Sequence, residues 1–232
     1  MSPDPTVAAR IIHRGRTLSA LGLLAVAGAV LLALGPTPIE AHQGLAQKIF
    51  YIHAPSAWCT LVAFSLVGLA GGLYLWLKDP RLDRFAAASA EVGVVFASVI
   101  LTTGPIWAKP IWGTWWTWDT RLTLTLFEFF LFVGYLTLRA ALHDRSERAR
   151  FSAVLGIMGL ILVPFIHLSV YLWGGMHPRP IVLKPSAPSL PPEMLRTLLI
   201  SLGAFSLLYL GLVTLRYGIA LAHDAVEETR NG

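Results

Sequence analysis

Six long runs of apolar residues, separated by short charged or proline-rich stretches, constrain the fold of this 232-residue chain more than any other feature. A bilayer core is about 30 Å thick, and roughly 20 apolar residues in a helix span it. The sequence therefore predicts an all-α, polytopic membrane protein with six transmembrane helices in a single membrane domain, residues 1–232. The expected spans are 18–34, 55–77, 85–103, 122–140, 151–173 and 195–217.

The composition excludes an ordinary soluble domain and several kinds of active site. Charged residues make up 13% of the chain, whereas soluble domains contain about 25%. Cys59 is the only cysteine, so no intramolecular disulfide, Cys-x-x-Cys pair, c-type haem attachment motif or thiolate metal cage can form. The sequence also lacks a P-loop, a Gly-x-Ser-x-Gly motif and a His-Glu-x-x-His motif.

The distribution of positive charge predicts the orientation of the helices. Six spans place both termini on one side, where the segments carry 12 Lys and Arg residues, against 6 in the other connections. By the positive-inside rule, both termini are cytoplasmic. The net charge of +5 is therefore explained by membrane topology and does not indicate nucleic acid. The connections expected at 37–54, 106–121 and 174–192 then all lie outside.

The connection expected at 106–121 is an outward aromatic loop. It contains Trp112-Gly-Thr-Trp-Trp-Thr-Trp-Asp-Thr-Arg-Leu122, with four of the eight tryptophans of the chain. If this stretch were helical, Trp112, Trp115, Trp116 and Asp119 would share one face. Such an indole surface suits a large planar ligand, although indoles are also favoured at the membrane–water interface. The residues alone leave both interpretations open.

Two outward histidines, His53 and His177, are each expected at a junction between a helix and a loop, with a tryptophan nearby. Imidazoles from separate loops can bind a haem iron from both faces. Lys109, Arg121 or Arg179 could then pair with the propionates. Interfacial side chains without any ligand explain the same pattern equally well.

The aromatic stretch resembles the tryptophan-rich "WWD" signature of haem-handling proteins. Together with Tyr51-Ile-His-Ala-Pro-Ser-Ala-Trp58 and the six-span layout, it makes nearly the whole chain similar to the CcmC family, haem exporter protein C of cytochrome c maturation. The resemblance implies that His53 and His177 are the axial ligands of haem b. It also implies a segment that holds the haem and meets a haem chaperone: Trp112, Gly113, Thr114, Trp115, Trp116, Trp118, Asp119 and Arg121.

The same resemblance implies a function and a set of partners. Haem is delivered to the chaperone CcmE at the periplasmic face of the bacterial inner membrane, and a histidine of CcmE becomes joined to a haem vinyl group. The other partners are the ABC subunits CcmA and CcmB, the small membrane protein CcmD and membrane lipid. The chain is expected to handle haem without being an enzyme, although it could assist that covalent attachment. Supporting residues are expected at His167, Tyr51, Trp58, Lys109 and Arg179.

Two other functions compete with haem delivery. The first is a membrane electron-transfer subunit of the cytochrome b type, in which the ligands commonly lie inside the spans. Only His167 lies inside a span, about 9 Å deep at roughly 1.5 Å per residue, and no histidine of another helix lies at a matching depth. The second is a structural subunit of an ABC complex, in which the tryptophans only anchor the protein at the interface.

Overall fold

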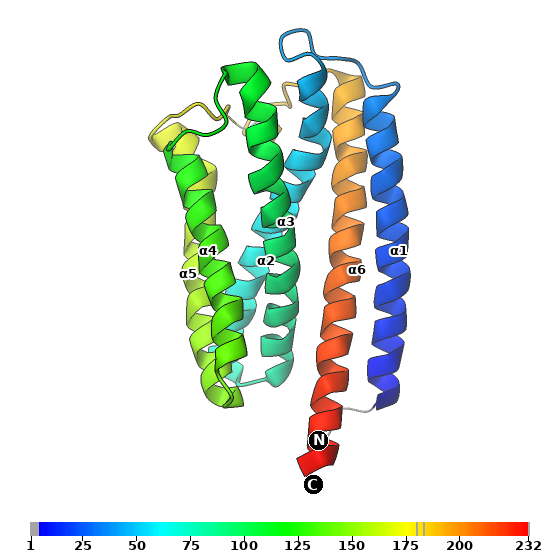
Figure 1. Cartoon of the computed structure of the whole chain (residues 1–232), viewed down its shortest axis with the longest axis vertical. Helices are drawn as coiled ribbons and strands as arrows, with labels where there is room; N and C mark the ends of the chain where they lie inside the picture. The colour runs from blue at the N-terminus through cyan, green and yellow to red at the C-terminus, as the bar shows by residue number, and fades with distance from the viewer. Residues whose placement is uncertain (1–4, 180, 183, 232) are drawn as a thin grey trace.

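The computed structural model describes residues 5–179, 181–182 and 184–231. Six long helices run up and down as a bundle, with both ends of the chain at the same end of the molecule (Figure 1). Each helix is long and apolar enough to cross a membrane, which confirms the predicted fold class. The elements are α1 (Pro5–Leu34), the short 3-10 helix η1 (Leu45–Ile49), α2 (Phe50–Leu77), α3 (Pro80–Trp112), α4 (Thr120–Ala141), α5 (Arg145–Leu172) and α6 (Pro192–Asn231).

Several helices extend beyond the predicted apolar spans. The first helix begins at Pro5 and the last ends at Asn231, because a helix can continue in polar sequence outside the bilayer, where hydropathy no longer marks it. Ion pairs hold some of these ends together, as Arg84 of α3 does with Asp224 of α6 at 2.9 Å. Glu91, which lies within the expected span 85–103, pairs with Arg216 of α6.

The expected loop at 106–121 is wrong in its extent, because α3 continues to Trp112 and α4 begins at Thr120. The Gly104-Pro105 pair predicts a helix end, yet Pro105 and Pro110 both lie inside α3. A proline in a helix removes one backbone N–H donor, and membrane helices tolerate this loss where neighbouring groups satisfy the freed carbonyl. The connection is therefore only residues 113–119.

The connecting residues 113–119 are not helical, so the shared helical face expected for the indoles and Asp119 is not formed. Helix α3 ends where Gly113 adopts a φ of 74° and Lys109 donates to the Gly113 carbonyl at 2.9 Å. Asp119 then starts α4, since its Oδ1 accepts from the backbone N–H of Leu122 at 3.0 Å. A carboxylate in this position satisfies one of the unpaired N–H groups of a first helical turn.

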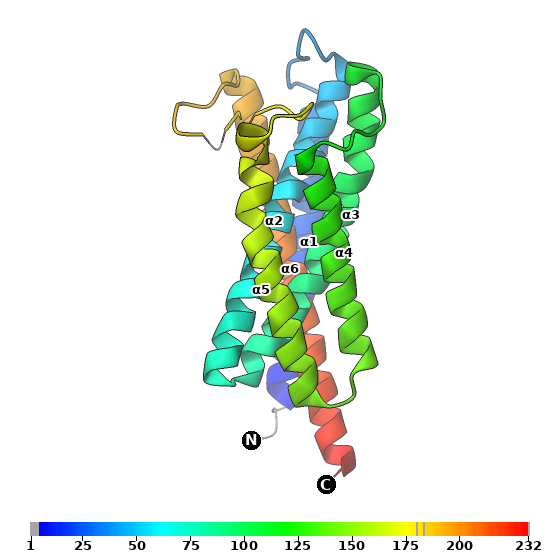
Figure 2. The same cartoon turned by 90° about the vertical axis from the view of Figure 1, so that its left-hand side faces the viewer.

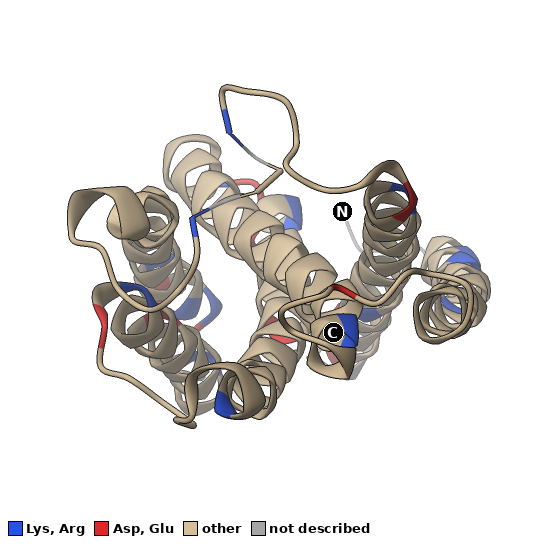
Figure 3. Ribbon diagram, turned by 90° about the horizontal axis from the view of Figure 1, so that it is seen from above, with Lys and Arg blue, Asp and Glu red and all other residues tan. Residues whose placement is uncertain are grey.

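Helix α2 lies centrally and packs against α3, α5 and α6, whereas α1 packs mainly against α6. Seen from above, α1 stands at the edge of the molecule beside α6 (Figure 3). This pair is close because glycines face the partner helix. A Cβ atom at Gly15, Gly22 or Gly211 would lie 2.5–2.6 Å from the partner backbone. The bundle therefore consists of a four-helix group, α2 to α5, with the α1–α6 pair against one side.

The buried side chain of Lys48 closes the C-terminal end of α1. Its Nζ donates to the carbonyls of Ala33 at 2.7 Å, of Pro38 at 3.3 Å, and of Thr37. The last carbonyls of a helix have no partner within the helix, and a cation there also interacts favourably with the helix dipole. Lys48 thereby orders the start of the connection that leads to α2.

Replacing Lys48 with Met should destabilise the protein. Hydrogen bonds to a charged group are worth about 1.5–3 kcal/mol, and the substitution leaves buried carbonyls unsatisfied. We expect the free energy of unfolding in detergent to fall by about that amount, measured by denaturant titration. Lys78→Met is the matched control, because Lys78 also follows a helix end but lies exposed. Equal stability of the two variants would contradict this role of Lys48.

Candidate functional site

Three connections meet at the end of the molecule opposite the termini, which we call the distal end. They comprise residues 35–49, 113–119 and the described part of 173–191. Figures 1 and 2 show these segments over the same end of the bundle from two directions. Segments that are distant in the sequence therefore lie together here, as the six-span topology predicts.

His53 lies in the first turn of α2, and its half-buried ring contacts α3. Its Nδ1 is 2.9 Å from the Thr103 hydroxyl, and its ring meets that of Trp107 edge-on, with 5.7 Å between centroids. The Trp107 Nε1 in turn donates to the side-chain carbonyl of Gln43 at 3.1 Å. Contacts from α3 therefore fix the orientation of the His53 ring.

His177 lies in the α5–α6 connection, just after two glycines with positive φ, Gly174 at 71° and Gly175 at 137°. Its Nδ1 is 2.9 Å from the Pro178 carbonyl, which can only accept, so Nδ1 carries the proton and Nε2 does not. Desolvation and then the charge of Arg121 lower the pKa of His177 to about 4. The imidazole is therefore neutral at physiological pH, with a lone pair on Nε2 that can bind a metal.

Arg121, in the first turn of α4, lies among the histidines of the distal end. Its positive charge lies within electrostatic reach of His53, His167 and His177. His53 and His177 are also within electrostatic reach of each other. The Arg121 Nη1 is buried and has no hydrogen-bond partner among the described residues. A buried cationic donor without a partner is costly. An anionic ligand beside the two imidazoles would satisfy it.

Asp119 joins the aromatic connection to the connection that carries His177. Its Oδ2 accepts from the Thr117 hydroxyl at 3.0 Å, and its charge interacts with Arg121 and His177. A Cβ added at Gly175 would lie 3.1 Å from the Asp119 side chain, so a larger residue would have to move that side chain by a few tenths of an ångström. The two connections are thus packed against each other.

The tryptophans of the aromatic stretch differ in exposure. Trp115 and Trp118 are 57% and 76% exposed, and Trp112 is 37% exposed. Trp116 is partly buried, and its Nε1 donor has no partner among the described residues. The rings of Trp116 and Trp118 meet edge-on at 5.8 Å. Thr114 stabilises the turn, since its hydroxyl donates to the Trp116 carbonyl at 2.9 Å.

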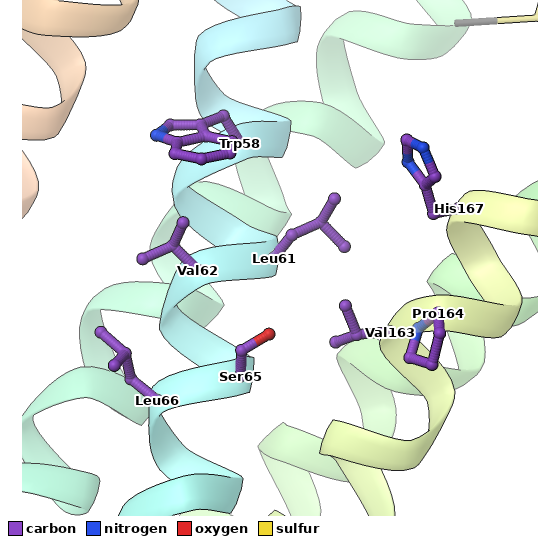
Figure 4. Close-up of a pocket in the computed structure, with 8 residues that line it drawn as sticks. All are labelled: Trp58, Leu61, Val62, Ser65, Leu66, Val163, Pro164 and His167. Carbon is purple, nitrogen blue, oxygen red and sulfur yellow. The ribbon is translucent and has the colours of Figure 1, made fainter. Parts of the chain in front are cut away.

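Trp58 and His167, both expected near the site, line an open groove of about 490 Å³ between α2 and α5 (Figure 4). The rest of this lining is almost entirely apolar, and Val163 and Pro164 come from the same helix as His167. His167 therefore lies in the wall of an open, largely apolar groove, within electrostatic reach of Arg121.

The three other expected supporting residues have separate roles in the structure. Tyr51 is buried and meets Phe50 edge-on at 5.5 Å. Lys109 caps α3 and lies 6.0 Å from the ring of Trp115. Arg179 lies 5.6 Å from the ring of Tyr171. Among the candidate cations, only Arg121 has a buried donor that lacks a partner within the described residues.

Sequence comparison assigns the family. The chain matches the family model described as CcmC, heme exporter protein C, over residues 4–231. The chain belongs to the CcmC family. It is 37% identical over 202 residues to the heme exporter protein C of Bradyrhizobium diazoefficiens, covering 84% of this chain and 76% of that protein. It is 34% identical over 204 residues to the corresponding protein of Haemophilus influenzae, covering 88% and 83%.

The similarity extends to mitochondria. A putative cytochrome c biosynthesis ccmC-like mitochondrial protein of Marchantia polymorpha is 34% identical over 149 residues, covering 64% of this chain and 63% of that protein. Members of the CcmC family are haem-handling membrane proteins of cytochrome c biogenesis, and this chain is a multi-pass member. The resemblance noted from the aromatic stretch is therefore confirmed at the level of the family.

The residues of the distal end fit haem as a cargo. The hydrogen bond at Nδ1 leaves Nε2 of His177 unprotonated, and the rings of His53 and His177 lie within electrostatic reach of each other. The buried donors of Arg121 and Trp116 that lack partners suit the propionates, and the neighbouring indoles suit the flat porphyrin. Sequence reasoning missed Thr103, Trp107 and Gly175. The i, i+4 spacing of the first two would have placed both on one helix face, had α3 been extended past residue 103.

Proposed function

We propose that this CcmC-family protein binds haem b between His53 and His177 and delivers it to the chaperone CcmE. The observation that supports this most is that the imidazoles of His53 and His177, from different elements, lie within electrostatic reach of each other and of Arg121, whose buried Nη1 has no hydrogen-bond partner among the described residues. One edge of the porphyrin would stay open to the chaperone. The protein holds and hands over its cargo, and any part in the covalent step on CcmE is assistance, not an enzymatic reaction of its own.

We place the distal end on the periplasmic side of the bacterial inner membrane. The opposite end, with both termini, carries the larger share of Lys and Arg, which favours the cytoplasm. A site for haem and CcmE at the distal end then faces the compartment in which c-type cytochromes mature. The exposed Trp115 and Trp118 provide a surface that the chaperone can approach.

The remaining proposed partners follow from what the chain lacks and from its family. It contains no P-loop, so ATP hydrolysis in the complex must come from another subunit, CcmA. The membrane subunit CcmB and the small protein CcmD complete the proposed assembly with membrane lipid. Nucleic acid is not among the proposed partners.

The first test is the visible spectrum of the full chain purified in detergent and supplied with haemin. We expect a six-coordinate, low-spin spectrum, because two neutral imidazoles bind the iron from opposite faces. A five-coordinate, high-spin spectrum, or no Soret band above that of free haemin, would refute the bis-histidine proposal.

A kinetic test separates delivery from electron transfer. The haem-loaded protein is mixed with purified apo-CcmE, and transfer is followed by haem staining of CcmE after denaturation. Haem should move to CcmE in the presence of the complex subunits. Rapid reduction of the bound haem by a quinol, without transfer, would instead support the cytochrome b-type alternative.

A further inference from the structure

The axial role of His53 requires a free Nε2, and the structure shows what controls that atom. A neutral imidazole has one proton, carried by Nδ1 or by Nε2. The nitrogen that binds a metal is set by the hydrogen bond that the other nitrogen makes. For His53, that bond is the 2.9 Å contact between Nδ1 and the hydroxyl of Thr103.

The direction of this hydrogen bond follows from a second one. The Thr103 hydroxyl is 2.7 Å from the carbonyl of Val99, one turn earlier in α3. A carbonyl only accepts, so the single hydroxyl proton of Thr103 is donated to Val99. The same oxygen must then accept from His53, which places the imidazole proton on Nδ1 and leaves the lone pair on Nε2.

Two other residues of α3 keep the ring in this orientation. Trp107 lies one turn after Thr103 and meets the His53 ring edge-on, while its own Nε1 is bound by Gln43. A Cβ at Gly104 would lie 3.3 Å from the Cε1 atom of His53, so the glycine leaves the ring little spare room. Thr103 and Gly104 thus approach the Nδ1–Cε1 side of the ring, and Trp107 packs edge-on against it.

We infer that Thr103 is a positioning residue that holds His53 as the Nδ1–H tautomer, with Nε2 directed to the haem iron. This inference rests on the proposed function, since it explains how His53 is prepared as a ligand. The hydrogen bond also makes the imidazole a stronger donor to the metal, which stabilises ferric haem over ferrous haem. His177 reaches the same tautomer through the carbonyl of Pro178, so both histidines present Nε2.

The test compares Thr103→Val with Thr102→Val in the full chain loaded with haemin. Thr102 is one residue away on the exposed side of α3 and bonds the Ser98 carbonyl, so its substitution removes the same kind of hydroxyl without touching His53. We expect Thr103→Val to weaken haem binding by about 10–100-fold, as loss of a ligand-orienting partner usually does. It should also raise the midpoint potential. Thr103→Ser should restore both values, and Thr102→Val should match the wild type.

Wild-type haem affinity and midpoint potential in Thr103→Val would overturn the inference. If that variant does not fold, ¹⁵N NMR of the histidine rings in the wild-type apo chain decides instead, with His53→Ala used for assignment. A proton on Nδ1 of His53 supports the inference, and a proton on Nε2 overturns it. Failure of the proposed function has a different signature, because His53→Ala would then keep the wild-type Soret band.

Discussion

Replacing either His53 or His177 with alanine should remove six-coordinate haem from the purified protein. Each imidazole supplies one of two axial bonds in the proposed site, so a single substitution leaves at most a five-coordinate, high-spin haem. We expect a loss of affinity greater than the roughly 10–100-fold typical of losing a group that only orients a ligand. The double variant should bind no haem above the background of the detergent. Absorption and EPR spectra of haemin titrations measure both effects.

Two other histidines provide controls for this experiment. His143 is exposed near the opposite end of the bundle, so His143→Ala should bind haem like the wild type. His167 lies near Arg121 at the edge of the groove, and His167→Ala should keep a low-spin spectrum with a moderate change in affinity. A high-spin spectrum in His167→Ala, together with a low-spin spectrum in His177→Ala, would mean that His167, and not His177, is the second axial ligand.

The number and order of the helices could be predicted because burial in lipid requires long apolar segments, which hydropathy detects directly. The helix ends could not, since polar residues continue a helix beyond the bilayer at little cost. The Gly104-Pro105 pair misled for another reason. Proline is a reliable helix breaker in water, but less so inside a membrane bundle.

Candidate ligands could be named from the sequence, but the contacts that orient their side chains could not. His53 and His177 stand out because each is an outward histidine expected at a helix–loop junction with a tryptophan nearby. Thr103 looks like one of many helical hydroxyls that bond their own backbone, and only the rotation of α3 against α2 brings it to His53. Likewise, the importance of Gly175 depends on a contact with Asp119, 56 positions earlier in the chain.

Substituting Gly175 with valine should separate the connection that carries His177 from residues 113–119, which include Asp119. The φ of 137° at Gly175 is nearly inaccessible to a β-branched residue, at a cost of about 1–3 kcal/mol. The new Cβ would also meet the Asp119 side chain at 3.1 Å, displacing a carboxylate that caps α4 and that is worth a further 0.5–2 kcal/mol or so. Since about 1.4 kcal/mol corresponds to a factor of ten in affinity, we expect haem to bind at least about tenfold more weakly.

Gly174→Val separates backbone strain from this contact. Gly174 has a φ of 71° and a Cβ there would meet no atom within 4 Å, so valine strains the backbone without displacing Asp119. Gly174→Val should therefore keep more of its haem affinity than Gly175→Val, and its α4 N-terminus should retain wild-type hydrogen-exchange protection at Leu122. Equal losses of haem affinity in both variants would mean that backbone strain alone explains the effect of Gly175→Val. The packing of the His177 connection against Asp119 would then have no part in holding the two histidines on a common ligand.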